Sequence, residues 1–140
     1  MSESDRIAVA ALLTRTGLGV MFIAHALQKL FVFTIPGTVQ FFQSVGFPGA
    51  LAYVTIAAEL VGGALLVLGV KARAVALALI PLLLGAAWVH HGNGWVFNAP
   101  NGGWEYPVFL ILVAIVVALL PQERYSVMAQ RSDRRTLARA

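Results

Sequence analysis

Four long apolar segments make up most of this chain, with limits near residues 7–33, 51–70, 73–91 and 104–120. Each is close to the roughly 20 residues that an α-helix needs to cross a hydrocarbon core of about 30 Å. In lipid every backbone amide and carbonyl must be paired, so these segments are predicted to be helices despite their valine-rich runs. The expected fold is all-α, a polytopic membrane protein built as an antiparallel four-helix transmembrane bundle.

The composition supports the same fold class. Hydrophobic residues make up 59% of the 140 residues and charged residues only 11%, whereas about 25% of the residues in a soluble domain are charged. One domain is expected at this length, so we assign residues 1–123 to a four-span membrane domain and 124–140 to a basic cytoplasmic tail. The chain has no cysteine, which excludes thiol redox chemistry and disulfides within it.

Basic residues occur at alternate connections along the chain. Arg6 precedes the first span and Lys71 and Arg73 follow the second, whereas the loops 34–50 and 92–103 contain neither lysine nor arginine. Five more arginines lie in the C-terminal tail, at Arg124, Arg131, Arg134, Arg135 and Arg139. Cytoplasmic loops carry the excess of basic residues, so both termini are predicted to be cytoplasmic. A basic tail beside a bilayer attracts anionic lipid first, and no nucleic-acid partner is expected.

The first outer loop contains the pattern of a short helix. Within residues 36–46, Val39, Phe42 and Val45 fall near one face, and Gly46 stands at a stop position. A helix of this kind would lie in the membrane interface. The second outer loop is rich in turn formers. It also holds aromatic residues typical of a belt at the headgroup level, namely Trp95, Trp104 and Tyr106.

Ionisable side chains interrupt the first two apolar segments, with Arg15, His25 and Lys29 in the first and Glu59 in the second. An ionised group in hydrocarbon costs from about 2.5 kcal/mol upward, so such residues usually face the protein interior and have a partner. Helical spacing places the three residues of the first segment on one stripe. We expect a buried ion pair between Glu59 and either Lys29 or Arg15, the alternative being basic side chains that reach out to the membrane surface.

A count of about 1.5 Å per residue gathers several polar groups at the outer end of the bundle. His25, His90 and Glu105 are candidate catalytic groups for proton handling, since histidine changes charge near neutral pH. His90 and Glu105 could equally lie at helix ends for structural reasons. A quinone pocket could use the neighbouring aromatic and histidine side chains as ligand-binding walls, namely Phe22, Tyr53, Trp88, His91 and Trp104. The spacing matches no recognised metal-ligand motif, and no metal is expected.

Several stretches resemble the DoxX family of small four-helix membrane proteins, over roughly residues 10–128. The matching residues are 15–25 with 28–30, 57–63, 68–73, His90 and 102–106. The family's closing signature is a glycine-rich turn followed by Arg-Tyr-Ser-Leu-Asp. Here Arg124-Tyr125-Ser126 is kept, Pro121-Gln122-Glu123 replaces the glycines, and Met128 stands where the acid would be.

The resemblance implies a multi-pass protein of the bacterial inner membrane. The family's name comes from association with a terminal quinol oxidase, and members are often labelled as oxidoreductases or resemble partners of other redox proteins. We accordingly expect a redox-associated protein that binds a quinone, or a subunit of a redox complex, near the outer leaflet. The alternatives are a structural or assembly subunit that presents Phe41 and Phe42 to a partner, and a transporter of protons or small solutes. Enzymatic activity and homo-oligomer formation stay open at this point.

Overall fold

The computed structural model of the chain describes residues 1–121 and 125–127, and in these ranges all regular structure is helical. Its elements are α1 (Glu3–Phe31), α2 (Ile35–Ser44), α3 (Ala50–Leu68), α4 (Ala72–His90), a 3₁₀ turn η1 (His91–Asn93) and α5 (Glu105–Leu119). Three helices are long and apolar enough to cross a membrane: α1, α3, and α4 with η1. The fourth apolar helix, α5, has 15 residues. The arginines of the predicted tail, 124 to 139, lie outside the described residues.

Local chemistry explains where the helices begin and end. The Ser2 hydroxyl accepts a hydrogen bond from the Asp5 amide, and the Asp5 carboxylate accepts one from the Ser2 amide. This capping box starts α1 four residues before the apolar segment begins. Gly69 ends α3 in the left-handed region, with φ of 70°, a conformation that costs glycine little. Pro36 stands in the first turn of α2, where it loses no helical hydrogen bond.

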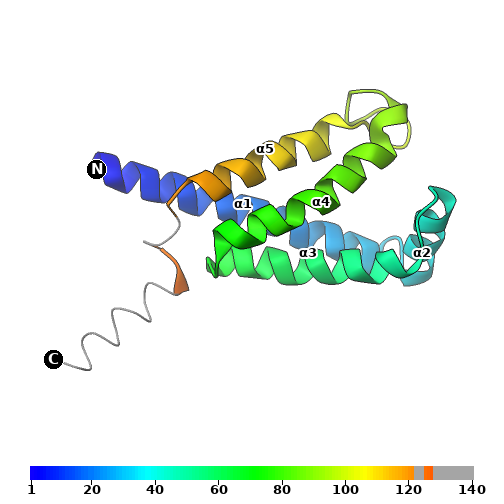
Figure 1. Cartoon of the computed structure of the whole chain (residues 1–140), viewed down its shortest axis with the longest axis horizontal. Helices are drawn as coiled ribbons and strands as arrows, with labels where there is room; N and C mark the ends of the chain where they lie inside the picture. The colour runs from blue at the N-terminus through cyan, green and yellow to red at the C-terminus, as the bar shows by residue number, and fades with distance from the viewer. Residues whose placement is uncertain (122–124, 128–140) are drawn as a thin grey trace.

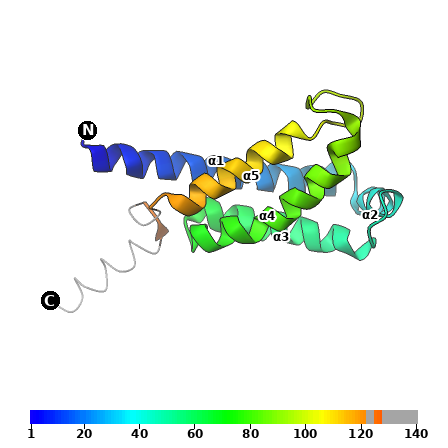
Figure 2. The ribbon, with the colours of Figure 1, turned by 45° about the horizontal axis from the view of Figure 1, so that its top comes forward.

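The four long helices form two antiparallel pairs, α1 with α3 and α4 with α5 (Figures 1 and 2). The N-terminus, the α3–α4 turn and the end of α5 lie at one end of the molecule, while α2 and the loop between η1 and α5 lie at the other (Figure 1). Gly19 and Gly63 bring α1 and α3 close together. A Cβ atom added to either glycine would lie 2.7 Å from the backbone oxygen of the other, so only glycine permits this approach.

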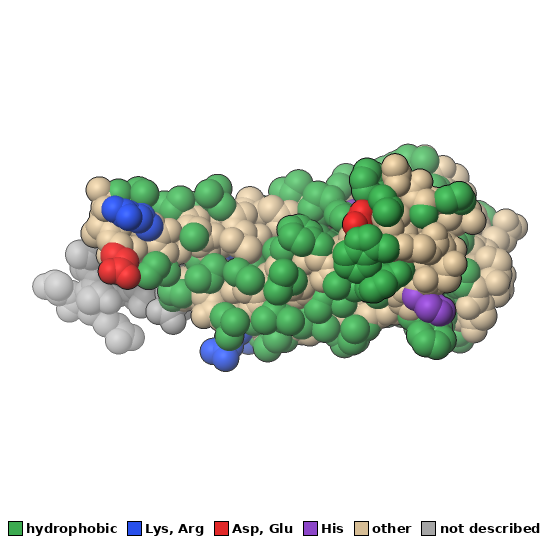
Figure 3. Space-filling view, turned by 90° about the horizontal axis from the view of Figure 1, so that it is seen from above, with side chains coloured by type: hydrophobic (Ala, Val, Ile, Leu, Met, Phe, Trp, Pro, Cys, Tyr) green, Lys and Arg blue, Asp and Glu red, His purple; other side chains and the backbone are tan. Residues whose placement is uncertain are grey.

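The buried core lies toward the end that carries the α3–α4 turn. All four long helices contribute to it, through Leu18, Phe22, Leu66, Ala72, Ala76, Leu79, Leu83, Leu110, Ala114 and Val117. On the face in Figure 3, hydrophobic side chains are spread over the whole length of the molecule, and lysine and arginine side chains lie toward the N-terminal end. Large apolar side chains are also exposed along every long helix, which is typical of helices surrounded by lipid.

Candidate functional site

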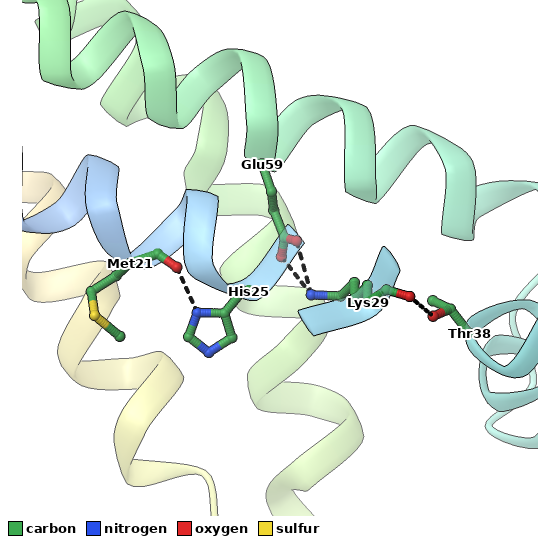
Figure 4. Close-up of polar contacts among 5 residues, drawn as sticks. All are labelled: Met21, His25, Lys29, Thr38 and Glu59. Atoms are coloured by element: carbon green, nitrogen blue, oxygen red, sulfur yellow. Dashed lines mark hydrogen bonds and ion pairs between the residues drawn. The ribbon is translucent and has the colours of Figure 1, made fainter. Parts of the chain in front are cut away.

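Lys29 of α1 and Glu59 of α3 form an ion pair near the α2 end of the bundle (Figure 4). The Lys29 Nζ atom donates to both carboxylate oxygens, at 2.8 and 2.9 Å. Helical side chains lean toward the N-terminus of their own helix, so residues on antiparallel neighbours lean toward each other. The Glu59 side chain is only 5% exposed and that of Lys29 is 19% exposed. The negative charge of the buried Glu59 carboxylate is therefore balanced by Lys29 where α1 contacts α3.

Arg15, the rival partner proposed for Glu59, lies elsewhere and makes different bonds. Its side chain is buried, at 2% exposure, and the guanidinium donates to the backbone oxygens of Leu66 and Val67 at 2.7 Å. A third bond, of 2.6 Å, goes to the backbone oxygen of Tyr125. The last carbonyls of a helix have no amide partner within it and attract a cation. Arg15 therefore caps α3 and neither pairs with Glu59 nor extends to the surface.

Thr38 fastens α2 to the end of α1, a contact that the sequence pattern did not reveal. Its hydroxyl lies 3.2 Å from the backbone oxygen of Lys29 and 2.9 Å from that of Thr34, and the first of these contacts is visible in Figure 4. Thr38 is the buried residue of α2. The short helix is thus attached to the same residue that pairs with Glu59.

A cavity of about 580 Å³ lies beside the ion pair, with walls from all five α-helices. Its polar lining consists of His25, Lys29, Thr55, Glu59, His90 and Tyr106, and its aromatic lining also includes Phe22, Phe41, Phe42 and Phe47. The remaining lining is mostly aliphatic. An apolar cavity of this size with a few convergent polar groups has the character of a small-molecule site.

Two histidines line this cavity, and in each of them the Nδ1 atom lies within hydrogen-bond distance of a backbone carbonyl oxygen. The Nδ1 atom of His25 lies 2.7 Å from the Met21 backbone oxygen (Figure 4), and the Nδ1 atom of His90 lies 3.0 Å from the Asn101 backbone oxygen. A carbonyl oxygen only accepts hydrogen bonds, so each Nδ1 carries the proton. The Nε2 atom of a neutral ring is then an acceptor, and neither Nε2 has a bonding partner among the described residues.

Tyr106, in the first turn of α5, stands next to His25. The two rings are stacked with centroids 5.6 Å apart and planes inclined by 28°. The Tyr106 hydroxyl is buried and has no hydrogen-bond partner within the described part of the chain. A buried hydroxyl without a partner costs free energy, and it calls for an explanation such as a ligand. The sequence pattern had assigned Tyr106 to an interfacial belt.

Four of the five predicted ligand-wall residues do not line the cavity. Phe22 lines it, whereas Trp88 is exposed and stacks on His91 at 5.2 Å. Trp104 packs instead against Trp95. Tyr53 is exposed, because it precedes Glu59 by six residues and so points about 120° away from it around the helix.

Glu105, predicted as a catalytic group, also lies apart from the cavity lining. Its carboxylate accepts a 2.7 Å hydrogen bond from the Phe97 amide and so braces the outer loop. Among the described residues no group of three or more His, Asp or Glu side chains is placed to hold a metal ion. The groups that the fold does bring together are His25, Lys29, Glu59 and His90, with Tyr106 added.

Comparisons with known proteins agree with this architecture. The family model described as DoxX matches residues 10–92, which is more than half of the chain. The Bacillus subtilis (strain 168) protein named "Putative oxidoreductase CatD" is 36% identical over 112 residues, which cover 79% of this chain and 78% of that protein. No solved structure matches the chain. With its apolar helices and these two matches, the chain belongs to the DoxX family.

Proposed function

We propose that this protein binds the head group of a quinone or quinol in the cavity between its two helical pairs, in support of redox metabolism in a bacterial inner membrane. The buried, partnerless Tyr106 hydroxyl beside His25 is the observation that carries the proposal. The relative in Bacillus subtilis is named as an oxidoreductase. Because the chain has no thiol, redox chemistry here needs a redox-active ligand or a redox partner.

In the proposed arrangement α1, α3, α4 and α5 cross the bilayer, with both termini in the cytoplasm. Helices of 19 residues such as α3 and α4 are about 28 Å long, close to the hydrocarbon thickness. The shorter α5 spans with help from its flanking residues, and α2 lies along the outer interface. Arg6 near the start of α1, Lys71 in the α3–α4 turn and Arg73 at the start of α4 support this orientation, since they lie at the end opposite α2.

The polar groups of the cavity suit a ring that bears two oxygens. The Tyr106 hydroxyl donates a hydrogen bond to one ring oxygen. The Nε2 atom of His25 accepts one from a quinol hydroxyl, and His90 offers a second acceptor on the side of the outer loop. The Lys29–Glu59 pair holds α1 against α3 at the cavity wall. Phe22 and the aromatic side chains of α2 enclose the flat faces of the ring.

A partner role has its own support at the outer end of the molecule. Phe41, Trp95 and Phe97 are exposed there, and an aromatic surface of this kind is typical of a protein interface. Such a surface would dock a subunit of a redox complex or a second copy of this chain. An assembly role without ligand chemistry would use the same surface and would leave the cavity empty.

Binding of a water-soluble naphthoquinone to Tyr106→Phe is the direct test. The variant keeps the ring stacked on His25 but removes the hydroxyl. A hydrogen bond contributes about 1 kcal/mol, so we expect its Kd to rise about fivefold in equilibrium dialysis of detergent-purified protein. Tyr53→Phe, the same change at an exposed tyrosine, should leave the Kd unchanged.

Two results would contradict the proposal. Absence of naphthoquinone and benzoquinone binding to the unaltered protein would leave the assembly role as the better reading. Equal Kd values for Tyr106→Phe and the unaltered protein would mean that the Tyr106 hydroxyl does not bind the ligand.

A further inference from the structure

The cavity is open on one side. Some of its lining residues, such as Phe22 and Leu110, belong to the buried core. In contrast, Val54 and Leu51 of α3, Ala78 and Pro81 of α4, and Phe41 and Val45 of α2 line the cavity and are also exposed on the outside of the molecule. A residue that lines the cavity and is also exposed on the outer surface lies at the rim of an opening. The mouth of the cavity therefore lies between α3 and α4 and is bordered at its outer end by α2.

The spacing of α3 and α4 explains this mouth. Near the α3–α4 turn the two helices are in tight contact, since a Cβ added to Gly62 would lie 2.9 Å from the Leu79 side chain. Farther along α4, a Cβ added to Gly85 would meet nothing within 4 Å. Figures 1 and 2 both show that α3 and α4 diverge toward the end of the molecule that carries α2. The gap opens on the half of the molecule that holds the polar site.

The rim is apolar and lies at membrane depth. Val54 follows the outer end of α3, at Ala50, by four residues, or about 6 Å along the helix axis. Ala58, on the same wall, is about 12 Å from that end. Side chains at this depth meet acyl chains or the inner part of the headgroup region. The polar groups His25 and Tyr106 come from α1 and α5, the helices across the cavity from this rim.

We infer that the cavity opens sideways into the outer leaflet between α3 and α4, and that its ligand is a lipid-soluble ring with a long hydrocarbon tail. The ring lies against His25 and Tyr106, and the tail leaves past Val54 and Pro81 into the bilayer. A cavity of about 580 Å³ accommodates a ring and the first part of a tail. A tail of many isoprenoid units has to continue outside. This inference rests on the proposed function and specifies its ligand class and route of entry.

Two valine-to-tryptophan variants on one helix test the route. Val54 on the rim and Val61 away from the cavity are equally exposed, at 61% and 60%. We expect Val54→Trp to weaken binding of a long-tailed menaquinone about tenfold in nanodiscs, because the indole crowds the tail. The tail-less naphthoquinone should keep its Kd within about twofold, since the ring site is untouched. Val61→Trp should affect neither ligand.

A photoreactive probe gives a second readout that does not depend on a variant. A menaquinone analogue with a diazirine on its tail should attach to the exposed rim of α3 and α4, as located by mass spectrometry of the peptides. Attachment to α1, to α5 or to the loop after η1, with ring binding intact, would overturn the lateral route. A phospholipid probe with the same diazirine chain should attach less; equal attachment would make the occupant a lipid and overturn the ligand class. Failure of the tail-less ring to bind would instead overturn the proposed function.

Discussion

At the scale of single residues, Lys29 and Glu59 differ in how they tolerate the loss of their partner. The lysine side chain is partly exposed and lies near the end of α1, whereas the carboxylate is almost fully enclosed. A long basic side chain extends to the membrane surface when it is unpaired, but a short carboxylate in the middle of a helix does not. The two halves of one ion pair therefore have unequal structural roles.

Single and double substitutions of the pair should reveal this inequality. Lys29→Met leaves the carboxylate buried without a partner and should lower the free energy of unfolding by about 3–5 kcal/mol. Glu59→Gln should lower it less, because Lys29 can turn outward. The double variant Lys29→Met, Glu59→Met should recover most of the loss, since no buried charge remains. Unfolding in mixed detergent micelles measures all three, and a double variant as unstable as Lys29→Met alone would refute this account.

The sequence predicted some of these residue contacts and not others. A partner for Glu59 could be expected in advance because charge in an apolar helix requires one, but the sequence left Lys29 and Arg15 as alternatives. The bonds of Arg15 could not be expected in advance, since its partners are backbone carbonyls, which every residue carries. The partnerless hydroxyl of Tyr106 is likewise a property of the assembled cavity.

At the scale of elements, glycine decides how closely α1 and α3 approach. Gly17 and Gly19 are two residues apart on α1, and they have opposite surroundings. A Cβ at Gly17 would meet nothing within 4 Å, whereas one at Gly19 would meet the backbone oxygen of Gly63 at 2.7 Å. In the sequence alone these two glycines of α1 are not distinguishable. The helices themselves were predictable to within a few residues, because apolar length and caps are local signals.

Matched alanine substitutions test the contact between these helices. Gly19→Ala should lower the free energy of unfolding by about 1–3 kcal/mol, because the new methyl group pushes α1 away from α3. Gly17→Ala should be neutral or raise it by up to about 1 kcal/mol, because alanine favours the helix. Thermal unfolding of the two variants in the same detergent provides the comparison. A Gly19→Ala variant as stable as Gly17→Ala would mean that α1 and α3 are not in direct backbone contact.

At the scale of the whole molecule, the buried core and the cavity occupy opposite halves of the bundle. Phe22, Leu83 and Leu110 belong to both and form the boundary between them. The confinement of basic residues to alternate connections predicts which end of the molecule faces outward, and this stays a prediction. Amino-acid patterns did not predict the divergence of α4 from α3, which arises from packing at Gly62 and Leu79 and from open space at Gly85.

The natural absence of cysteine allows a clean test of the orientation in the membrane. Asn98→Cys places a thiol in the exposed loop near α2, and Ser4→Cys places one at the exposed start of α1. In spheroplasts a membrane-impermeant maleimide should label Asn98→Cys at once and Ser4→Cys only after permeabilisation. The reverse labelling pattern would invert the orientation and move the cavity to the cytoplasmic leaflet.

Thr38 joins α2 to the rest of the protein through the backbone of Lys29, and α2 adds Phe41, Phe42 and Val45 to the cavity wall. This ten-residue helix buries little else, so it has a small share in holding the bundle together. The short helix therefore contributes more to the cavity wall than to the buried core. An engineer who wished to admit a larger or smaller aromatic ring could change the side chains of this short helix and leave the four long helices as they stand.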